Sequence, residues 1–306
     1  MGKIIVLGGI NQDLIITAPR LPRIGETVMG NGFCTANGGK AANQAVAAAR
    51  LGGDVILIGA VGGDAAGSKM INNFSNEGID TSFTKIINGM PTGTAVITVC
   101  GGDNSIVMDA GANSALMPEH IGQSEEAFLK AEALVVQMEI PQETVEYSIK
   151  LAKKHGLAVM LDPAPASEIN KKIFEMVDVV KPNETESEFY TGIKTSTKEE
   201  AAKAVAFFKG LGVETAIVTL GEKGSVYNDF LSGEIFYQDA FEINSIIDTT
   251  AAGDCFMGAV AVMLSEKKKM AQAIKFASCA AALAVTKMGA QPSLPTRGEV
   301  EKICAF

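Results

Sequence analysis

Short apolar runs alternate with longer amphipathic stretches along most of the chain. The runs are rich in β-branched side chains and lie at Ile4–Leu7, Val55–Ile58, Leu134–Gln137, Ala158–Leu161, Val177–Val180 and Ala216–Thr219. Between several of them, apolar side chains recur with the spacing of an amphipathic helix, as at Gln142–His155 and Lys198–Leu211. Continuous apolar runs are typical of strands that are buried on both faces. The order predicts an α/β sandwich of three layers, in which helices flank a central, mostly parallel sheet.

Two stretches break this order with a two-residue alternation, from Leu14 to Phe33 and from Thr94 to Met108. In the second stretch, Ala95, Ile97 and Val99 would lie on one side of an extended strand and their neighbours on the other. A small sheet that projects from an α/β body is typical of a lid over a ligand crevice. Because both stretches lie inside the α/β region, we expect residues 1–306 to form one domain with lid strands from about 14–33 and 94–108.

The composition is that of a globular protein, with 306 residues, of which 47% are apolar or aromatic and 20% charged. Lysine and arginine number 26 against 35 for aspartate and glutamate, which gives a formal charge of −9. A chain with this acidic balance does not hold nucleic acid by general attraction to phosphate. We therefore expect no nucleic-acid partner, and any anionic ligand must be bound by local groups.

The N-terminal apolar run is too short for a signal peptide, because Asn11, Gln12 and Asp13 end it. No stretch approaches the ~18 apolar residues of a membrane-spanning helix. We therefore expect a cytoplasmic protein with no membrane partner. The five cysteines are far apart, and no two have the two-residue gap of a metal or redox motif. We expect them to be buried, reduced thiols.

The strongest local pattern is the run from Asp248 to Ala259, which leads into an apolar helix through Leu264. Small residues before a helix leave its first N–H groups uncovered, so the turn 251–254 is a candidate anion site. A carboxylate there, Asp254, would repel a bound phosphate unless it takes a proton from the hydroxyl that attacks the phosphorus. The alternative interpretation is that Asp254 only caps the helix.

A second glycine cluster, from Gly38 to Ala45, opens a helix that runs to Leu51. It is not a Walker A loop, because Cys34 stands where that loop has a glycine and Ala41 stands where it has serine or threonine. The dinucleotide-binding Gly-x-Gly-x-x-Gly pattern is also missing, which argues against a nicotinamide enzyme. Glycines here permit close backbone approach, and Lys40 would supply a polar contact unless it is only a surface lysine.

Polar side chains also follow the predicted strands. Asn11 and Asp13 come shortly after the first strand and, being two residues apart, share one side of an extended segment. Glu139 follows the strand that begins at Leu134. Ligands of open α/β sheets bind at the carboxyl ends of strands, where such groups could bind hydroxyls. For Asn11 and Asp13, local Asx turns are the alternative.

Two further clusters follow strands, Lys181–Glu186 and Thr219–Gly224. Glu184 and Glu186 could hold hydrated Mg²⁺ through water. Each cluster alone would be explained by a helix cap or a turn. Five such clusters at strand ends, however, indicate a site.

In this order the residues resemble the ribokinase branch of the PfkB sugar kinase superfamily, over essentially the whole chain. Gly253-Asp254 and Asn183-Glu184-Thr185-Glu186 are typical of the superfamily. The Gly38–Asn43 cluster and the tail Gly289-Ala290-Gln291-Pro292-Ser293 are typical of the branch. Segments that also match are Gly9–Asp13, Leu21–Thr27, Pro91–Gly93 and Asp248–Gly258. The resemblance implies a ribokinase-like three-layer sandwich with a small β-sheet lid.

The resemblance implies transfer of a phosphate from ATP to the 5-hydroxyl of D-ribose. Asp254 would be the catalytic base, and the N–H groups of Ala251, Ala252 and Gly253 the anion hole. The residues implied to hold the sugar are Asn11, Asp13, Gly39, Lys40, Asn43, Glu139 and Asp254. Those implied to face ATP are Asn183, Thr219, Leu220, Gly221, Glu222, Lys223, Gly224, Gly253, Asp254 and Ser278.

The same resemblance implies Mg²⁺ as a cofactor and activation by a monovalent cation, usually K⁺, in a cage beside the anion hole. The implied K⁺ ligands, several of them main-chain carbonyls, are Asp248, Thr250, Ala284, Lys287, Gly289 and Ser293. It also implies a homodimer that forms through the lid strands.

Three residues depart from the family pattern. Ala41 and Ala251 stand where glycine is common, and we expect the methyl group to be tolerated if φ is negative there. Gln12 stands where an apolar or small residue is usual, and its amide could favour a sugar such as 2-deoxyribose. A kinase for another small sugar, a ketohexose or a nucleoside therefore remains an alternative. A sugar-binding protein without catalysis is a second alternative, although the complete Asp254 turn argues against it.

Overall fold

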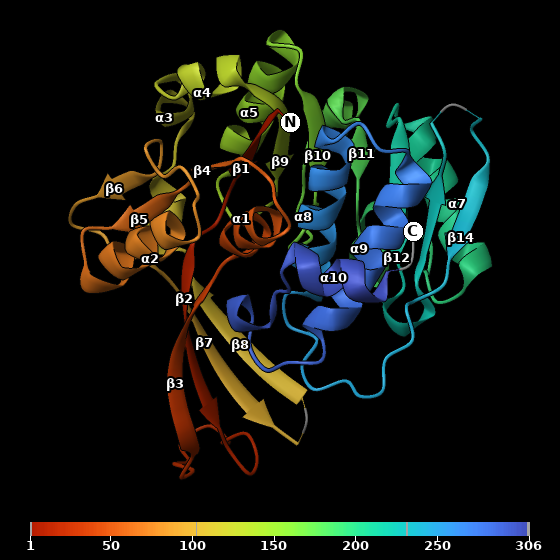
Figure 1. The fold of residues 1–306 in the computed structure, drawn as a ribbon. Coiled ribbons are helices and arrows are strands. Elements are labelled where there is room, and N and C mark those ends of the chain that lie inside the picture. The colour runs from red at the N-terminus through yellow and green to blue at the C-terminus, as the bar shows by residue number, and fades with distance from the viewer. Residues whose placement is uncertain (1, 102, 231, 305–306) are drawn as a thin grey trace.

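The structure, a computed structural model, describes residues 2–101, 103–230 and 232–304. Its centre is an eight-stranded sheet (Figure 1) in the order β14 (Ile235–Gln238), β13 (Ser225–Asn228), β12 (Thr215–Thr219), β11 (Val179–Val180), β10 (Ala158–Leu161), β9 (Ala131–Val136), β1 (Lys3–Leu7) and β4 (Val55–Ile58). The six neighbouring strands β4, β1, β9, β10, β11 and β12 run parallel to one another. Strand β13 is antiparallel to β12, and β14 is antiparallel to β13. The carboxyl ends of the parallel strands therefore lie at one edge of the sheet.

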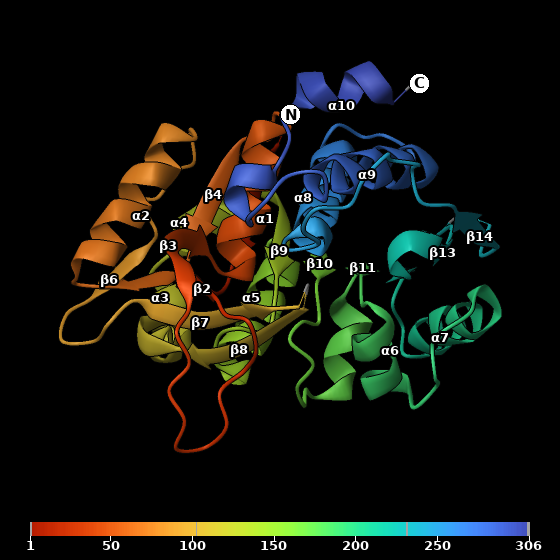
Figure 2. The ribbon, with the colours of Figure 1, turned by 90° about the horizontal axis from the view of Figure 1, so that it is seen from below.

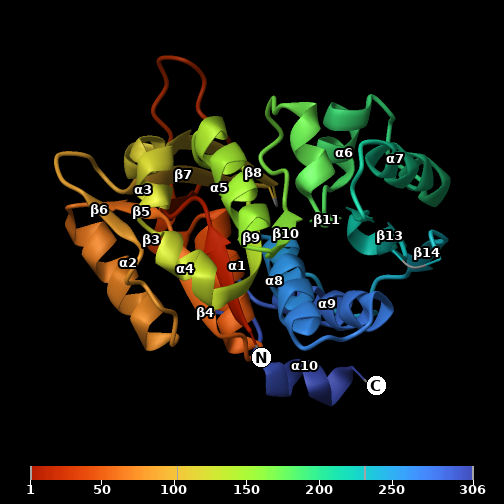
Figure 3. The same cartoon turned by 90° about the horizontal axis from the view of Figure 1, so that it is seen from above.

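Helices cover both faces of this sheet, which makes three layers (Figures 2 and 3). One layer contains α1 (Lys40–Arg50), α2 (Ala65–Asn76), α8 (Ala252–Ser265), α9 (Met270–Ala284) and α10 (Arg297–Ile303). The other contains α3 (Pro118–Gly122), α4 (Glu125–Lys130), α5 (Gln142–Lys154), α6 (Glu184–Thr191) and α7 (Lys198–Gly210). Strand side chains alternate between the two cores: Ile4 packs in the first and Ile5 in the second. The predicted three-layer α/β sandwich is confirmed.

A separate four-stranded sheet projects from the body (Figure 1), in the order β3 (Asn31–Gly38), β2 (Asn11–Thr17), β7 (Gly93–Cys100) and β8 (Asp103–Asp109). We call it the lid sheet. The second predicted stretch, 94–108, falls on β7 and β8. The first, about 14–33, overlaps the end of β2 and the start of β3, but its bounds differ: β2 begins at Asn11, residues 18–30 form no strand, and β3 continues to Gly38. Pro19 and Pro22 lie in that loop, and proline cannot donate to a strand ladder.

The remaining elements connect these layers. A short parallel pair joins β5 (Ala60–Gly62) to β6 (Lys85–Ile87). Short 3-10 helices lie at Gly111–Ala115, Lys171–Met176, Gly221–Lys223 and Gln291–Ser293. In the described part of the chain, no helix is both long enough and apolar enough to span a membrane.

Most predicted elements have the observed bounds within a few residues, and Val55–Ile58 and Ala158–Leu161 match fully. The expectation for the cysteines holds for Cys255, Cys279 and Cys304, which are buried. It is wrong for Cys34, which is exposed on β3, and Cys100 at the end of β7 is only partly buried, because the lid sheet has no helix layer over these strands.

Candidate active site

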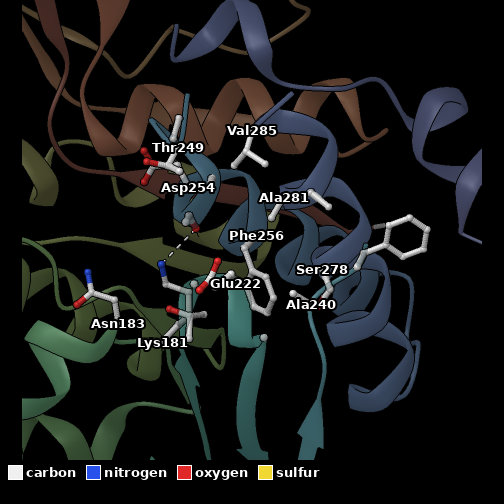
Figure 4. A pocket seen from close by; sticks show the side chains of 18 of the residues that line it. Lys181, Asn183, Glu222, Ala240, Thr249, Asp254, Phe256, Ser278, Ala281 and Val285 are labelled. Carbon is white, nitrogen blue, oxygen red and sulfur yellow. Dashed lines mark hydrogen bonds between the residues drawn. The ribbon is translucent and has the colours of Figure 1, made fainter. Parts of the chain in front are cut away.

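A cavity of about 730 Å³ lies between the carboxyl edge of the sheet and the first turn of α8 (Figure 4). Many of the predicted residues line it, namely Lys40, Asn183, Glu184, Glu186, Thr219, Gly221, Glu222, Gly224, Ala251, Ala252, Gly253, Asp254 and Ser278. Sequence reasoning missed its apolar wall, to which Phe256 and Ala281 contribute from α8 and α9.

Asp254 lies in the first turn of α8 and is buried. It does not cap the helix, because Ala251 occupies the N-cap position and no side chain caps there. Instead, Oδ2 of Asp254 accepts a hydrogen bond from Nδ2 of Asn43 at 3.0 Å, and Oδ1 accepts one from Nε2 of Gln44 at 3.1 Å. Two amides from α1 thus fix the carboxylate, and the capping interpretation is wrong.

The turn before Asp254 has an unusual backbone. Ala251 has φ 62° and ψ 8°, the left-handed region that glycine favours. The condition under which we expect the methyl group to be tolerated, a negative φ, is therefore not met at Ala251. That condition is met at Ala41, which lies in α1 and is not among the residues with positive φ. The N–H of Ala252 donates to the carbonyl of Thr249 at 3.2 Å, while those of Ala251 and Gly253 have no partner within the described residues.

Lys181 contacts this turn from the end of β11. Sequence reasoning gave Lys181 no role in the site. Its buried ammonium donates to the carbonyl of Gly253 at 3.2 Å and lies 3.1 Å from Oδ2 of Asp162 (Figure 4). Asp162 follows β10 and Lys181 follows β11, so both project from the carboxyl edge. A charged residue directly after a buried strand was the available signal.

A group of polar residues, which we call the polar cluster, lies beside the cavity at the base of the lid sheet. Its members are Asn11, Asp13, Lys40, Asn113 and Glu139. Asn11 and Asp13 occupy β2, not an Asx turn, and both are buried. Oε2 of Glu139 accepts from the backbone N–H of Lys40 at 2.8 Å and lies 3.5 Å from Nδ2 of Asn11. Asn113, which sequence reasoning missed, donates to Oδ1 of Asn11 at 2.8 Å. The Asn11 amide therefore directs its N–H groups away from Asn113.

Close backbone approach builds this cluster. Gly39 has φ 90°, and a Cβ there would lie 2.6 Å from the carbonyl oxygen of Gly9. Only glycine fits where the end of β3 turns into α1 against the end of β1. This contact brings the start of α1, with Lys40, close to Asn11 and Glu139.

The carboxylates in this cluster have shifted pKa values. Burial, followed by the charges of Glu139 and Asp254, raises the pKa of Asp13 to about 7. Burial also raises the pKa of Glu139 to about 6, although Lys40 opposes the shift. For Lys40, burial lowers the pKa, but the carboxylates of Asp254, Asp162 and Glu139 outweigh it and raise the pKa overall. Such groups are typical of a functional site.

Two predicted ATP residues do not face the cavity. Leu220 is buried in the core on the α5 side of the sheet, and Nζ of Lys223 donates to the carbonyl of Ser196. Successive side chains of the turn point in different directions, so a loop that contacts a ligand need not direct every side chain to it.

Asn183 and Glu186 form a capping box at the start of α6. Oε2 of Glu186 accepts from the N–H of Asn183 at 2.8 Å, and burial, followed by the charge of Asp162, raises the pKa of Glu186. Oδ1 of Asp162 is buried in the cavity wall and has no hydrogen-bond partner in the described part of the chain. No three His, Cys, Asp or Glu side chains among the described residues form a direct metal-binding group. These acidic oxygens fit a cation that keeps its own water.

The predicted K⁺ residues come from two segments that hydrogen bonds join. Oδ2 of Asp248 accepts from the N–H of Gly289 at 2.8 Å, and its Oδ1 accepts from the N–H of Thr250 at 2.9 Å. Burial raises the pKa of Asp248, but these hydrogen bonds outweigh it and lower the pKa overall. The hydroxyl of Ser293 donates to Ala290, and the carbonyl of Ala284 accepts from the N–H of Lys287 at 3.3 Å. Oxygen-rich loops of this kind fit a monovalent cation.

Gln12 does not face the site. It lies between Asn11 and Asp13 on β2, and alternate side chains of a strand point to opposite faces. The amide of Gln12 is therefore on the other face of the lid sheet, and the expectation that it selects the sugar has no support in the structure.

Comparison with known proteins gives a consistent result. A model of the pfkB family carbohydrate kinases matches residues 1–297. The ribokinase of Haemophilus influenzae is 43% identical over 295 residues, 96% of this chain and 95% of the relative. A deoxyribokinase of Salmonella typhi is 36% identical over 295 residues, 96% of this chain and 95% of the relative. The structure of Arabidopsis thaliana ribokinase complexed with ribose and ATP matches with a TM-score of 0.93 at 34% identity. The match covers 100% of this chain and 99% of the Arabidopsis chain.

The ribokinase-like fold, with a helix N-terminus and a buried carboxylate facing one cavity, defines a phosphotransferase of small hydroxylated substrates. The chain belongs to the pfkB family of carbohydrate kinases.

Proposed function

We propose that the protein is a ribokinase, which transfers the γ-phosphoryl group of ATP to O5 of D-ribose. The observation that carries the proposal is the place of Asp254. Its carboxylate is hydrogen-bonded to Asn43 in the first turn of α1, whose first residue, Lys40, donates its N–H to Glu139 of the polar cluster, and it also lines the large cavity. A sugar held by the cluster and a nucleotide held in the cavity would therefore meet at Asp254. Relatives named ribokinase that match almost the full chain support the same function.

Asp254 is placed to act as the general base. Each carboxylate oxygen accepts one amide N–H and keeps lone pairs with which to take the hydroxyl proton. The N–H groups of Ala251 and Gly253 are open to the oxygens of the transferring phosphoryl group, and that of Ala252 is shared with Thr249. Lys181 holds the Gly253 carbonyl, and its ammonium adds positive charge at the cavity wall.

Cations fit the proposal at two places. Glu184, Glu186 and the unpartnered Oδ1 of Asp162 would hold Mg²⁺ through water, and the bound ion would offset phosphate charge. K⁺ would lie between the 248–250 and 284–293 segments, where Asp248 already joins the two. Its charge would orient the anion-hole turn from outside the cavity.

Among sugars, the polar cluster favours a fully hydroxylated pentose. The buried Asn11 and Asp13 and the partly buried Glu139 offer several donors and acceptors, and a sugar that lacks one hydroxyl would leave one of them unpaired. Similarity alone does not decide between ribose and 2-deoxyribose, because relatives of both kinds match the chain. Phosphorylation of 2-deoxyribose is therefore the second candidate.

The lid sheet supports a homodimer. It exposes apolar side chains that no other part of the described chain covers, among them Phe33 at 64% and Val107 at 70%. Exposed apolar surface of this kind is typical of an interface. We propose that two copies pair through their lid sheets.

The test is an ADP-release assay with D-ribose, 2-deoxy-D-ribose and D-fructose, run in K⁺ and again in Na⁺. We expect kcat/KM to be highest for D-ribose, the product to carry phosphate on O5 by ³¹P NMR, and activity to fall when Na⁺ replaces K⁺. A higher kcat/KM for another sugar would overturn the substrate assignment. Equal rates in both cations would overturn the K⁺ site.

A further inference from the structure

Gln44 is a fully buried side chain of α1 that does not line the cavity, yet it contacts the base. Its Nε2 donates to Oδ1 of Asp254 at 3.1 Å and to Oδ2 of Asp162 at 2.7 Å. Both amide hydrogens are therefore used on carboxylates that come from different layers of the fold. Asp254 belongs to α8, in one helix layer, and Asp162 follows β10 of the central sheet.

The orientation of this amide is fixed at its other end. Oε1 of Gln44 accepts from Nε2 of Gln137 at 2.6 Å, and Gln137 is also fully buried. A flipped Gln44 amide would place its oxygen against two carboxylates, where electrostatic repulsion would disfavour it. Gln137 itself fits because Gly8 leaves room, since a Cβ at Gly8 would lie 2.2 Å from Oε1 of Gln137.

Through Asp162 the same network reaches the anion-hole turn. Oδ2 of Asp162 accepts from Gln44 and pairs with Lys181, and Lys181 donates to the carbonyl of Gly253. The base and the turn that would receive the phosphoryl oxygens are thus held by one connected set of buried polar groups. A displacement of the Gln44 amide would move Asp254 relative to that turn.

We infer that Gln44 is a positioning residue for phosphoryl transfer, which holds the Asp254 carboxylate in line with the Gly253 turn. The inference rests on the proposed role of Asp254 as the base. Gln44 does not line the cavity, and it contacts Oδ2 of Asp162 and not Oδ1, the oxygen proposed to face Mg²⁺, so its loss should leave ligand binding almost unchanged. A misplacement of about 1 Å can cost ~10²-fold in rate, so the effect should fall on kcat.

The test compares Gln44→Met, which keeps the length of the side chain and removes the amide, with the wild type. We expect kcat to fall by about 50- to 100-fold, while KM for the sugar and for MgATP change less than threefold. Gln137→Met leaves Gln44 in place but frees its amide, and we expect kcat to fall by about fivefold. This second variant keeps the test available if Gln44→Met does not fold.

The matched control is Asn228→Leu. Asn228 is a fully buried amide that accepts from the N–H of Ala216 and donates to the carbonyl of Glu214, outside the cavity. We expect it to lower Tm by as much as Gln44→Met and to leave kcat unchanged. A Gln44→Met variant that keeps its kcat, or one that raises KM for MgATP instead, would overturn the inference.

The rates are taken on whichever panel sugar the wild type phosphorylates fastest, so a wrong sugar assignment does not affect the comparison. A wild-type chain that is inactive on every sugar would overturn the proposed function and this inference together. An active wild type whose Gln44→Met variant keeps full kcat would overturn the inference alone, and if that variant does not fold, full kcat in Gln137→Met would do the same.

Discussion

Asn43 Nδ2 lies 3.0 Å from Asp254 Oδ2, and this hydrogen bond joins the first turn of α1 to the first turn of α8. The two residues are 211 positions apart in the sequence. They meet because α1 and α8 pack side by side in one helix layer, each with its N-terminus at the carboxyl edge of the sheet. The polar cluster at the lid base and the cavity therefore share one wall.

Replacing Asp254 by asparagine removes the proton acceptor and keeps the shape of the side chain. We expect kcat to fall by about 10³-fold, within the range typical of a lost general base. The dissociation constant for ribose, measured by calorimetry without nucleotide, should change less than threefold, because Asn11, Asp13 and Glu139 remain. A variant with near-normal kcat would contradict the role of Asp254.

The pH dependence of sugar use should follow Asp13 and Glu139. Their pKa values in the free protein are raised to about 7 and about 6. Sugar hydroxyls donate better to ionised carboxylates, so kcat/KM for the sugar should rise from about pH 5.5 and level off only above about pH 8, one unit above the pKa of Asp13. Asp13→Asn should lower kcat/KM and move the rising limb toward pH 6. A flat profile in the wild type would contradict this assignment.

The same shifts have a consequence for stability. Both carboxyls keep their protons to a higher pH when folded than when unfolded. The folded state therefore binds more protons between about pH 4 and 7, so the contribution of these groups to the free energy of unfolding falls as pH rises through that range. Asp13→Asn should remove part of this decrease, which urea titrations at pH 5 and pH 8 would show.

Much of this arrangement was accessible from the sequence, for identifiable reasons. The parallel strands are continuous apolar runs, and the Asp254 turn combines small residues with a carboxylate at a helix start. One partner of Asp254, Asn43, was among the predicted site residues, but the other, Gln44, was not accessible because it occupies a core-facing helix position. Asp162, which binds Gln44, gives only the weak signal of one polar residue after an apolar run. Long-range packing decides which such residues meet. Leu220 and Lys223 belong to the loop predicted to bind ATP, but their side chains point away from the cavity, which the loop sequence does not indicate.

The backbone at Ala251 predicts a stability change. An L-residue in the left-handed region costs roughly 1 kcal/mol or more, and the Ala251 methyl group is only partly buried. Ala251→Gly should therefore raise the free energy of unfolding by up to about 1 kcal/mol. Lys267, the other non-glycine residue with positive φ in the described chain, is the control. Lys267→Gly should give a similar gain with kcat unchanged, and a loss of stability in Ala251→Gly would contradict the assigned strain.

The proposed dimer depends on apolar side chains of the lid sheet. Val107→Asp places a charge on a side chain that is 70% exposed in the single chain. Sedimentation equilibrium should show the wild type as a dimer and the variant as a monomer, because burying an unpaired carboxylate at an interface is costly. Leu129→Asp is the control: Leu129 is 68% exposed on α4, away from the lid sheet, and its variant should remain a dimer. A wild type that sediments as a monomer would overturn the proposal.

Arg50 connects α1 to the proposed K⁺ loop. Its Nη1 donates to the carbonyls of Gln291 and Leu294 at 2.7 and 2.9 Å, and its Nε donates to Glu77 at 3.0 Å. These bonds fix a loop whose carbonyls would surround the cation, so Arg50→Met should raise the K⁺ concentration for half-maximal activity by about tenfold, equivalent to roughly 1.4 kcal/mol.

Arg297→Met is the control for this prediction. Arg297 pairs with Glu266 and Glu301, and its Nη1 donates to the carbonyl of Leu51 at 3.3 Å, but it donates to neither loop carbonyl that Arg50 holds. Its variant should lose comparable stability and keep the K⁺ response of the wild type. If both variants shift the K⁺ response equally, general loosening of the fold explains the effect, and Arg50 has no specific role in the cation loop.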